Sequence, residues 1–74
     1  MTGPPTYVTG TVKRFHTDKA FGFIEMPDGL DVFVHAKELR KSGIHKPLNP
    51  GDRVRFVSNE GERGLFATDI SLLP

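Results

Sequence analysis

Residues 21–35 (FGFIEMPDGLDVFVH) constrain the fold more than any other stretch, because two alternating segments flank a short turn. Successive side chains of a β-strand point to opposite faces of a sheet, so this alternation predicts two strands. Between them, Pro-Asp-Gly at 27–29 predicts a three-residue hairpin loop, with Gly29 in the left-handed backbone region. The stretch is therefore expected to form an antiparallel hairpin.

The loop also sets the pairing of the two strands. With Met26 and Leu30 flanking it, antiparallel register gives four pairs of partners: Ile24 with Val32, Gly22 with Val34, Phe23 with Phe33, and Phe21 with His35. One face of the hairpin then carries no polar side chain: Gly22, Ile24, Met26, Leu30, Val32 and Val34. We expect this face to lie in the core.

The opposite face of the hairpin combines rings with charges: Lys19, Phe21, Phe23, Glu25, Asp31, Phe33, His35 and Lys37. Its ends are too charged to bury, whereas its middle is aromatic. Another part of the chain could cover the rings, but only residues 37–51 and the N-terminal residues are free to do so. A contiguous exposed apolar patch usually marks a binding surface, so we expect the rings to face a ligand.

The remainder of the 74-residue chain also consists of short alternating stretches separated by turns. The strands are expected at 8–15, 21–26, 31–36, 53–58 and 65–72, and NEGERGL at 59–65 predicts a hairpin turn. Two glycines and two prolines interrupt residues 37–51, which leaves at most a short helical turn near 36–41. We expect an all-β, five-stranded antiparallel barrel over 8–74, preceded by a flexible N-terminal arm at 1–7.

Composition removes several classes of function. The chain has no cysteine, which excludes disulfides and cysteine-ligated metal sites. It shows no signal-peptide pattern and no apolar run of about 18 residues, so we expect a cytoplasmic protein without a membrane partner. The net charge of +1 argues against capture of nucleic acid by bulk charge alone.

Catalytic and metal-binding chemistry find little support in the titratable residues. His16, His35 and His45 do not have the spacing of a ligand pair. Glu25 and Asp31 are expected to be a solvated like-charge pair across the hairpin and not an acid–base couple. A chain this short has little capacity to build a pocket. We therefore expect a non-enzyme that needs neither metal nor cofactor.

Two runs inside the hairpin resemble known motifs. KAFGFIEM at 19–26 and VFVHA at 32–36 are similar to the two ribonucleoprotein motifs of the cold-shock domain family, in that family's order. The similarity extends through TGTVKRF before them and NPGDRVRFVSNEGERGLFATDI after them, from about Thr9 to Ile70. RNA-recognition-motif domains carry such motifs in the opposite order, with helices between the strands. The resemblance therefore implies the five-stranded oligonucleotide-binding (OB) barrel.

The resemblance also implies a set of ligand-contacting residues. Ring contacts are implied for Phe21, Phe23, Phe33 and His35, and polar or cationic contacts for Lys13, Lys19, Asp31 and Arg63. Phe15 would lie at the edge of the same surface and partly serve the core, and Phe66 would stand at a position where the family has a ligand-contacting polar residue.

Several residues depart from the family pattern. Arg14 stands in place of the usual tryptophan, and a guanidinium can stack on a base and attract phosphate. Plain alternation would turn Arg14 inward, so we expect a bulge near Lys13. Ala36 replaces a further phenylalanine, Ala20 a glycine, and residues 44–45 a loop aromatic. We expect a thinner stacking surface with reduced affinity.

Together these features predict a protein that binds single-stranded RNA and DNA by stacking bases on the rings. The family implies a role as an RNA chaperone or a modulator of transcription or translation, with a monomer expected and a dimer as the alternative. Arg53 and Arg55 alternate outward, where a solvated face is favoured over a second basic contact strip. The alternative function is a barrel whose reduced aromatic surface mediates protein–protein contact or dimerisation.

Overall fold

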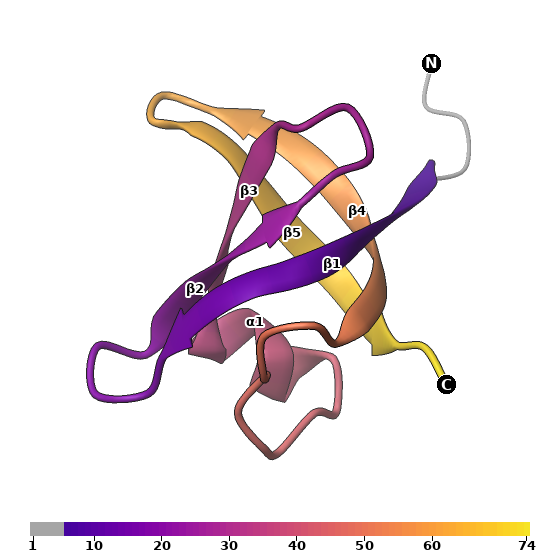
Figure 1. The fold of residues 1–74 in the computed structure, drawn as a ribbon. Helices are drawn as coiled ribbons and strands as arrows, with labels where there is room; N and C mark the ends of the chain where they lie inside the picture. The colour runs from indigo at the N-terminus through magenta and orange to yellow at the C-terminus, as the bar shows by residue number, and fades with distance from the viewer. Residues whose placement is uncertain (1–5) are drawn as a thin grey trace.

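Five strands and one short helix follow one another along residues 6–74, the part of the chain that the computed structural model describes (Figure 1). In chain order these elements are β1 (Tyr7–His16), β2 (Phe21–Glu25), β3 (Asp31–His35), α1 (Ala36–Lys41), β4 (Arg53–Gly61) and β5 (Gly64–Leu72). The strands close into a barrel in the order β1-β2-β3-β5-β4. The predicted five-stranded barrel and the predicted helical turn at 36–41 are both confirmed.

The long strand β1 closes the barrel because it pairs with two other strands along different halves of its length. Its first half pairs with β4 and its second half with β2, in both cases antiparallel. One pairing differs from the all-antiparallel expectation, since β3 and β5 are parallel at Phe33 and Phe66. The reason is topological: strand direction cannot alternate all the way around a closed ring with an odd number of strands, so one neighbouring pair must run the same way.

The β2–β3 hairpin has the register that its alternation predicts, from Phe21 opposite His35 to Glu25 opposite Asp31. Gly29 has a φ of 91°, and its N–H donates to the Met26 carbonyl at 2.8 Å, which closes the loop as expected. Leu30, however, is 52% exposed. The expectation that it lies in the core is wrong, because β2 ends at Glu25 and β3 begins at Asp31, so that Leu30 lies in the loop.

A bulge interrupts β1 where the register shifts between Val12 and Arg14. The expected outward position of Arg14 is thereby confirmed, and Phe15 turns inward to pair with Gly22. A β-carbon on Gly22 would lie 2.4 Å from the Arg14 carbonyl oxygen and 2.8 Å from the Phe15 α-carbon. Only glycine therefore allows β2 to approach the bulge this closely.

The core is aliphatic with one fully enclosed ring, and no polar side chain among residues 6–74 is buried. Its members come from every element: Val12, Ile24, Val32, Val34, Leu39, Leu48, Val54, Phe56, Ala67 and Ile70. Leu39 of α1 covers one end of the barrel, and the Ser42 hydroxyl just beyond the helix accepts a hydrogen bond from the Ile70 N–H at 2.9 Å. The connection from α1 to β4 is anchored as well, because Leu48 is 2% exposed.

Only part of the expected N-terminal arm at 1–7 belongs to the described residues. Its residues 1–5 lie outside the described part of the chain. Tyr7, however, is the first residue of β1 and pairs with Val57, so its assignment to the arm is wrong. Within residues 6–74, no helix has the length and apolar character needed to cross a membrane.

We predict that Ala20→Gly stabilises the protein. Ala20 has a φ of 61° in the turn between β1 and β2, a conformation that is unfavourable for any residue with a β-carbon. Relief of this strain should raise the free energy of unfolding by about 1 kcal/mol, measured by urea denaturation. In the control Ala36→Gly, at the first position of α1, stability should instead fall by up to about 1 kcal/mol. A loss of stability in Ala20→Gly would contradict the prediction.

Candidate functional site

Four rings lie together on the outer face of the β2–β3 hairpin, and we refer to Phe21, Phe23, Phe33 and His35 as the aromatic platform. Phe33 is at its centre, with ring centroids 5.5 Å from Phe21, 5.9 Å from Phe23 and 6.4 Å from His35. The Phe21 and Phe23 centroids are 6.0 Å apart with the rings nearly perpendicular. Pairing across the hairpin therefore brings together the four rings that the sequence placed on one face.

Three rings of the platform, Phe23, Phe33 and His35, form one wall of an open groove of about 630 Å³, and Phe21 lies beside it. Each phenyl ring is half-buried against its neighbours, whereas His35 is exposed. The opposite wall is the β4–β5 hairpin, from Gly61 to Ala67, and Glu38 of α1 closes one end. Residues 42–51, which could have covered the rings, do not line the groove. The face of the platform therefore remains accessible to a ligand.

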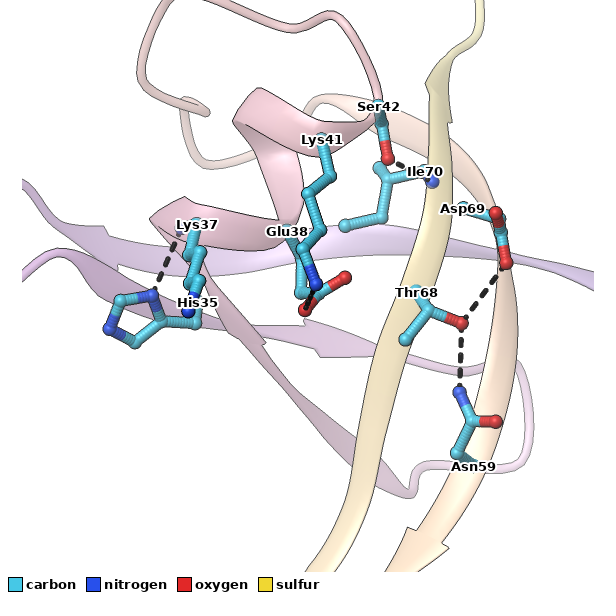
Figure 2. A network of polar contacts seen from close by, with 9 residues as sticks. All are labelled: His35, Lys37, Glu38, Lys41, Ser42, Asn59, Thr68, Asp69 and Ile70. Atoms are coloured by element: carbon cyan, nitrogen blue, oxygen red, sulfur yellow. Dashed lines mark hydrogen bonds and ion pairs between the residues drawn. The ribbon is translucent and has the colours of Figure 1, made fainter.

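Two further predicted residues stand on the opposite wall. Phe66 of β5 is 37% exposed and pairs with Phe33 across the parallel contact, and Arg63 lies exposed in the β4–β5 turn. The side-chain amide of Asn59 donates to the Thr68 hydroxyl at 3.0 Å (Figure 2). It also donates to the Phe66 carbonyl at 3.3 Å, so it ties β4 to β5 at this wall. Phe66 therefore lies on the strand next to Phe33, and its ring packs over Gly61, where a β-carbon would lie 3.1 Å from it.

Cationic side chains border the platform on the β1 side. The Arg14 guanidinium carbon lies 5.6 Å from the centroid of the Phe23 ring, which is cation–π distance. Lys13 forms an ion pair with Asp31 at 3.5 Å, and both side chains are substantially exposed, so the pair contributes little to stability. The bulge of β1 therefore presents two neighbouring cations at the edge of the rings.

Two predicted site residues lie elsewhere. Lys19 is exposed in the turn between β1 and β2 and is not on the strand face on which it was expected. Phe15 packs against the core and lines a second, smaller groove of about 310 Å³ together with α1 and residues 44–47. Its predicted contribution to the core is confirmed, but the bulge turns its ring away from the platform. Lys37, expected on the same face, is in α1.

Sequence reasoning missed one ring of the cluster. The His16 centroid lies 5.4 Å from that of Phe21, and the two residues are opposite each other in the β1–β2 pairing. The signal was present in the sequence, because a bulge that turns Arg14 outward also turns out the residue two positions later. Glu38 was missed as well, since a helix is needed to bring it to the end of the groove.

The other titratable residues form no second site that the structure defines. No group of three or more His, Asp or Glu among residues 6–74 is placed to hold a metal ion. Glu25 lies opposite Asp31 near the hairpin turn, as expected. Arg53 and Arg55 are exposed on β4, and the Arg55 guanidinium carbon lies 4.8 Å from the centroid of Tyr7. Whether they form a second contact strip stays a prediction.

A closed five-stranded barrel with an aromatic outer face and bordering cations is the architecture of an OB-fold nucleic-acid-binding domain. Residues 8–73 match the family described as the 'Cold-shock' DNA-binding domain. The chain therefore belongs to the cold-shock domain family, whose members bind nucleic acids and are not enzymes.

Curated relatives agree with the family match. The chain is 46% identical over 63 residues to the major cold shock protein CspA of Bacillus cereus, covering 85% of this chain and 92% of the relative. It is 46% identical over 61 residues to cold shock protein 2 of Lactiplantibacillus plantarum, covering 82% and 91%. Identity to cold shock protein CapB of Pseudomonas syringae pv. tomato is 40% over 65 residues, covering 88% and 93%.

We predict that the platform rings contribute far less to stability than the core ring. Phe33→Ala should lower the free energy of unfolding by about 1 to 2 kcal/mol, because it loses ring contacts that remain half in solvent. Phe56→Ala, which empties a fully buried position, should lower it by about 3 to 5 kcal/mol. Urea denaturation of the two variants gives the comparison. Equal losses would mean that the platform belongs to the core.

Proposed function

We propose that the protein binds single-stranded RNA and DNA by stacking unpaired bases on the aromatic platform. The observation that carries the proposal is the set of four rings on the outer face of a barrel whose core is already filled, beside a groove that no part of residues 6–74 closes. A soluble domain leaves such a surface open when it has a ligand to cover it.

The spacing of the rings suits an extended strand. Side chains on one face of a β-strand repeat every two residues, about 6.6 Å apart. The Phe21 and Phe23 centroids are separated by 6.0 Å, so successive bases of a stretched single strand can each meet a ring. Every base has a π face, and stacking therefore favours unpaired strands with only weak sequence preference.

Charge assists this stacking but does not dominate it. The chain carries a net charge of only +1, yet Lys13, Arg14 and Arg63 all border the rings or the groove. Phosphates of a bound strand would meet these cations while the bases meet the rings. Because few charges are involved, the salt dependence of binding should be shallow compared with that of a strongly basic protein.

Capture of unpaired strands needs neither nucleotide hydrolysis nor a cofactor. A protein that binds only the open form of an RNA shifts the folding equilibrium of that RNA by mass action. We propose that the protein acts in the cytoplasm as a monomeric RNA chaperone or a modulator of transcription or translation. The family membership and the names of the curated relatives support this role.

We predict that Phe21→Ala and Phe33→Ala each weaken binding of a fluorescently labelled, unstructured oligonucleotide about ten- to hundredfold. Fluorescence anisotropy is the measurement, and the chain's lack of tryptophan does not affect it. Tyr7→Ala is the matched control, because this ring is 45% exposed but lies at the far end of β1. Its affinity should stay within about twofold of that of the unchanged protein.

Two results would contradict the proposed function. One is the absence of binding to any single strand at micromolar protein concentration. The other is that substitution of the platform rings changes self-association, measured by analytical ultracentrifugation, instead of the affinity for single strands. The second result would favour the alternative in which the platform mediates dimerisation.

We predict that Arg14 contributes a phosphate contact in addition to any stacking. Arg14→Gln should reduce the slope of log affinity against log salt concentration by about 0.7, the value for one phosphate contact of a single strand. Lys41→Gln is the control, because Lys41 is paired with Glu38 at 3.7 Å on α1. An unchanged slope with reduced affinity would show that Arg14 acts by stacking alone.

A further inference from the structure

His35 is both a ring of the platform and the N-cap of α1. Its backbone is extended, with φ −99° and ψ 144°, as the residue before a helix usually is. Its side-chain Nδ1 accepts a hydrogen bond from the Lys37 N–H at 3.0 Å (Figure 2). One imidazole therefore satisfies an otherwise unpaired N–H of the helix and stands on the ligand-binding surface.

This cap defines which ring nitrogen carries the proton. A nitrogen that accepts a hydrogen bond must present its lone pair, so Nδ1 of the neutral ring is unprotonated. The proton of the neutral imidazole then belongs to Nε2. Figure 2 shows this second nitrogen on the side of the ring that faces away from α1.

Contacts at both ends of α1 fix the helix and thereby the orientation of the His35 ring. At its start, the Ala36 N–H donates to the Ala20 carbonyl at 2.8 Å. Beyond its end, the Ser42 hydroxyl accepts from the Ile70 N–H at 2.9 Å (Figure 2). Because the helix is attached to both the β1–β2 turn and β5, Lys37 presents its N–H to His35 from a fixed position.

The surroundings of His35 make its free N–H distinctive. The neighbouring phenyl rings, Phe33 and the cross-strand partner Phe21, have no hydrogen-bonding atoms. Three carboxylates line the same groove. Asp31 pairs with Lys13 at 3.5 Å and Glu38 pairs with Lys41 at 3.7 Å, whereas Glu62 lies in the β4–β5 turn and not on the platform. On the platform itself, Nε2–H is therefore the one polar group that can contact a stacked base.

We propose that His35 uses Nε2–H as a neutral hydrogen-bond donor to a carbonyl oxygen of a base on the platform, with its tautomer set by the cap of α1. This inference rests on the proposed function and adds a base-reading group to a surface that otherwise only stacks. Thymine and uracil offer two such oxygens, whereas adenine has none. His35 is thus a specificity-determining residue that depends on the helix beside it.

The tautomer is tested first, on the unchanged protein without any ligand. Long-range ¹H–¹⁵N correlation spectra at pH 8 distinguish a protonated from an unprotonated imidazole nitrogen. The expected spectrum has Nε2 protonated and Nδ1 unprotonated for His35. A proton on Nδ1, or rapid exchange between the two tautomers, would overturn the inference whether or not the protein binds nucleic acid.

Base reading is tested with labelled oligo(dT) and oligo(dA) of about eight nucleotides. His35→Phe keeps a ring but removes the donor, so the ratio of oligo(dT) to oligo(dA) affinity should fall about three- to tenfold. The self-stacking of free oligo(dA) affects both proteins equally and cancels in the comparison. An unchanged ratio would overturn base reading by His35.

A second variant separates the cap from the ring. His35→Asn retains a side-chain oxygen that can accept from the Lys37 N–H, so amide hydrogen exchange of residues 37–41 should keep the rate it has in the unchanged protein. It loses the ring, and affinity for both oligonucleotides should fall. His35→Phe should show faster exchange in these amides. Equal exchange in the two variants would contradict the cap, and failure of the unchanged protein to bind either oligonucleotide would instead contradict the proposed function.

Discussion

The antiparallel pairing of β2 with β3 is the interaction on which the rest of the structure depends. Side chains in a strand alternate strictly, so a slip of one residue would move every ring of one strand into the core and every aliphatic residue outward. The loop at 27–29 prevents the slip, because Gly29 adopts a φ of 91° and Met26 and Leu30 are hydrogen-bonded across it. One register therefore places the platform on one face of the hairpin and the core residues on the other.

The bulge in β1 extends this arrangement to a third strand. It reverses the facing of the residues that follow Val12, which brings Arg14 and His16 to the outside and Phe15 to the core. The bulge can approach β2 because Gly22 has no side chain. Gly22, between Phe21 and Phe23, therefore allows Arg14 to lie beside the platform. The same contact between β1 and β2 supports both the fold and the site.

Helix α1 shows how a short connection becomes part of a functional surface. Six residues are too few to form a stable helix by themselves, and Leu39, the Ala20 carbonyl and the Ile70 N–H supply the tertiary contacts that hold it. Once held, it places Glu38 at the end of the groove and presents an N–H to His35. The chemistry of a platform ring thus depends on packing at the end of the barrel.

The sequence alone determined the hairpin register, the five strands and the four rings of the platform, because period-two alternation and a glycine turn are local signals. The outward turn of Arg14 was predicted against that alternation, from the cost of burying an unpaired guanidinium. Only the tertiary structure decided what depends on closure of the barrel. It made β3 and β5 parallel, put Phe66 opposite Phe33, and separated Lys19 and Phe15 from the rings. It also placed the Lys37 N–H on Nδ1 of His35. These features join residues through strand closure, a bulge and a helix cap, and no periodicity along the chain encodes them.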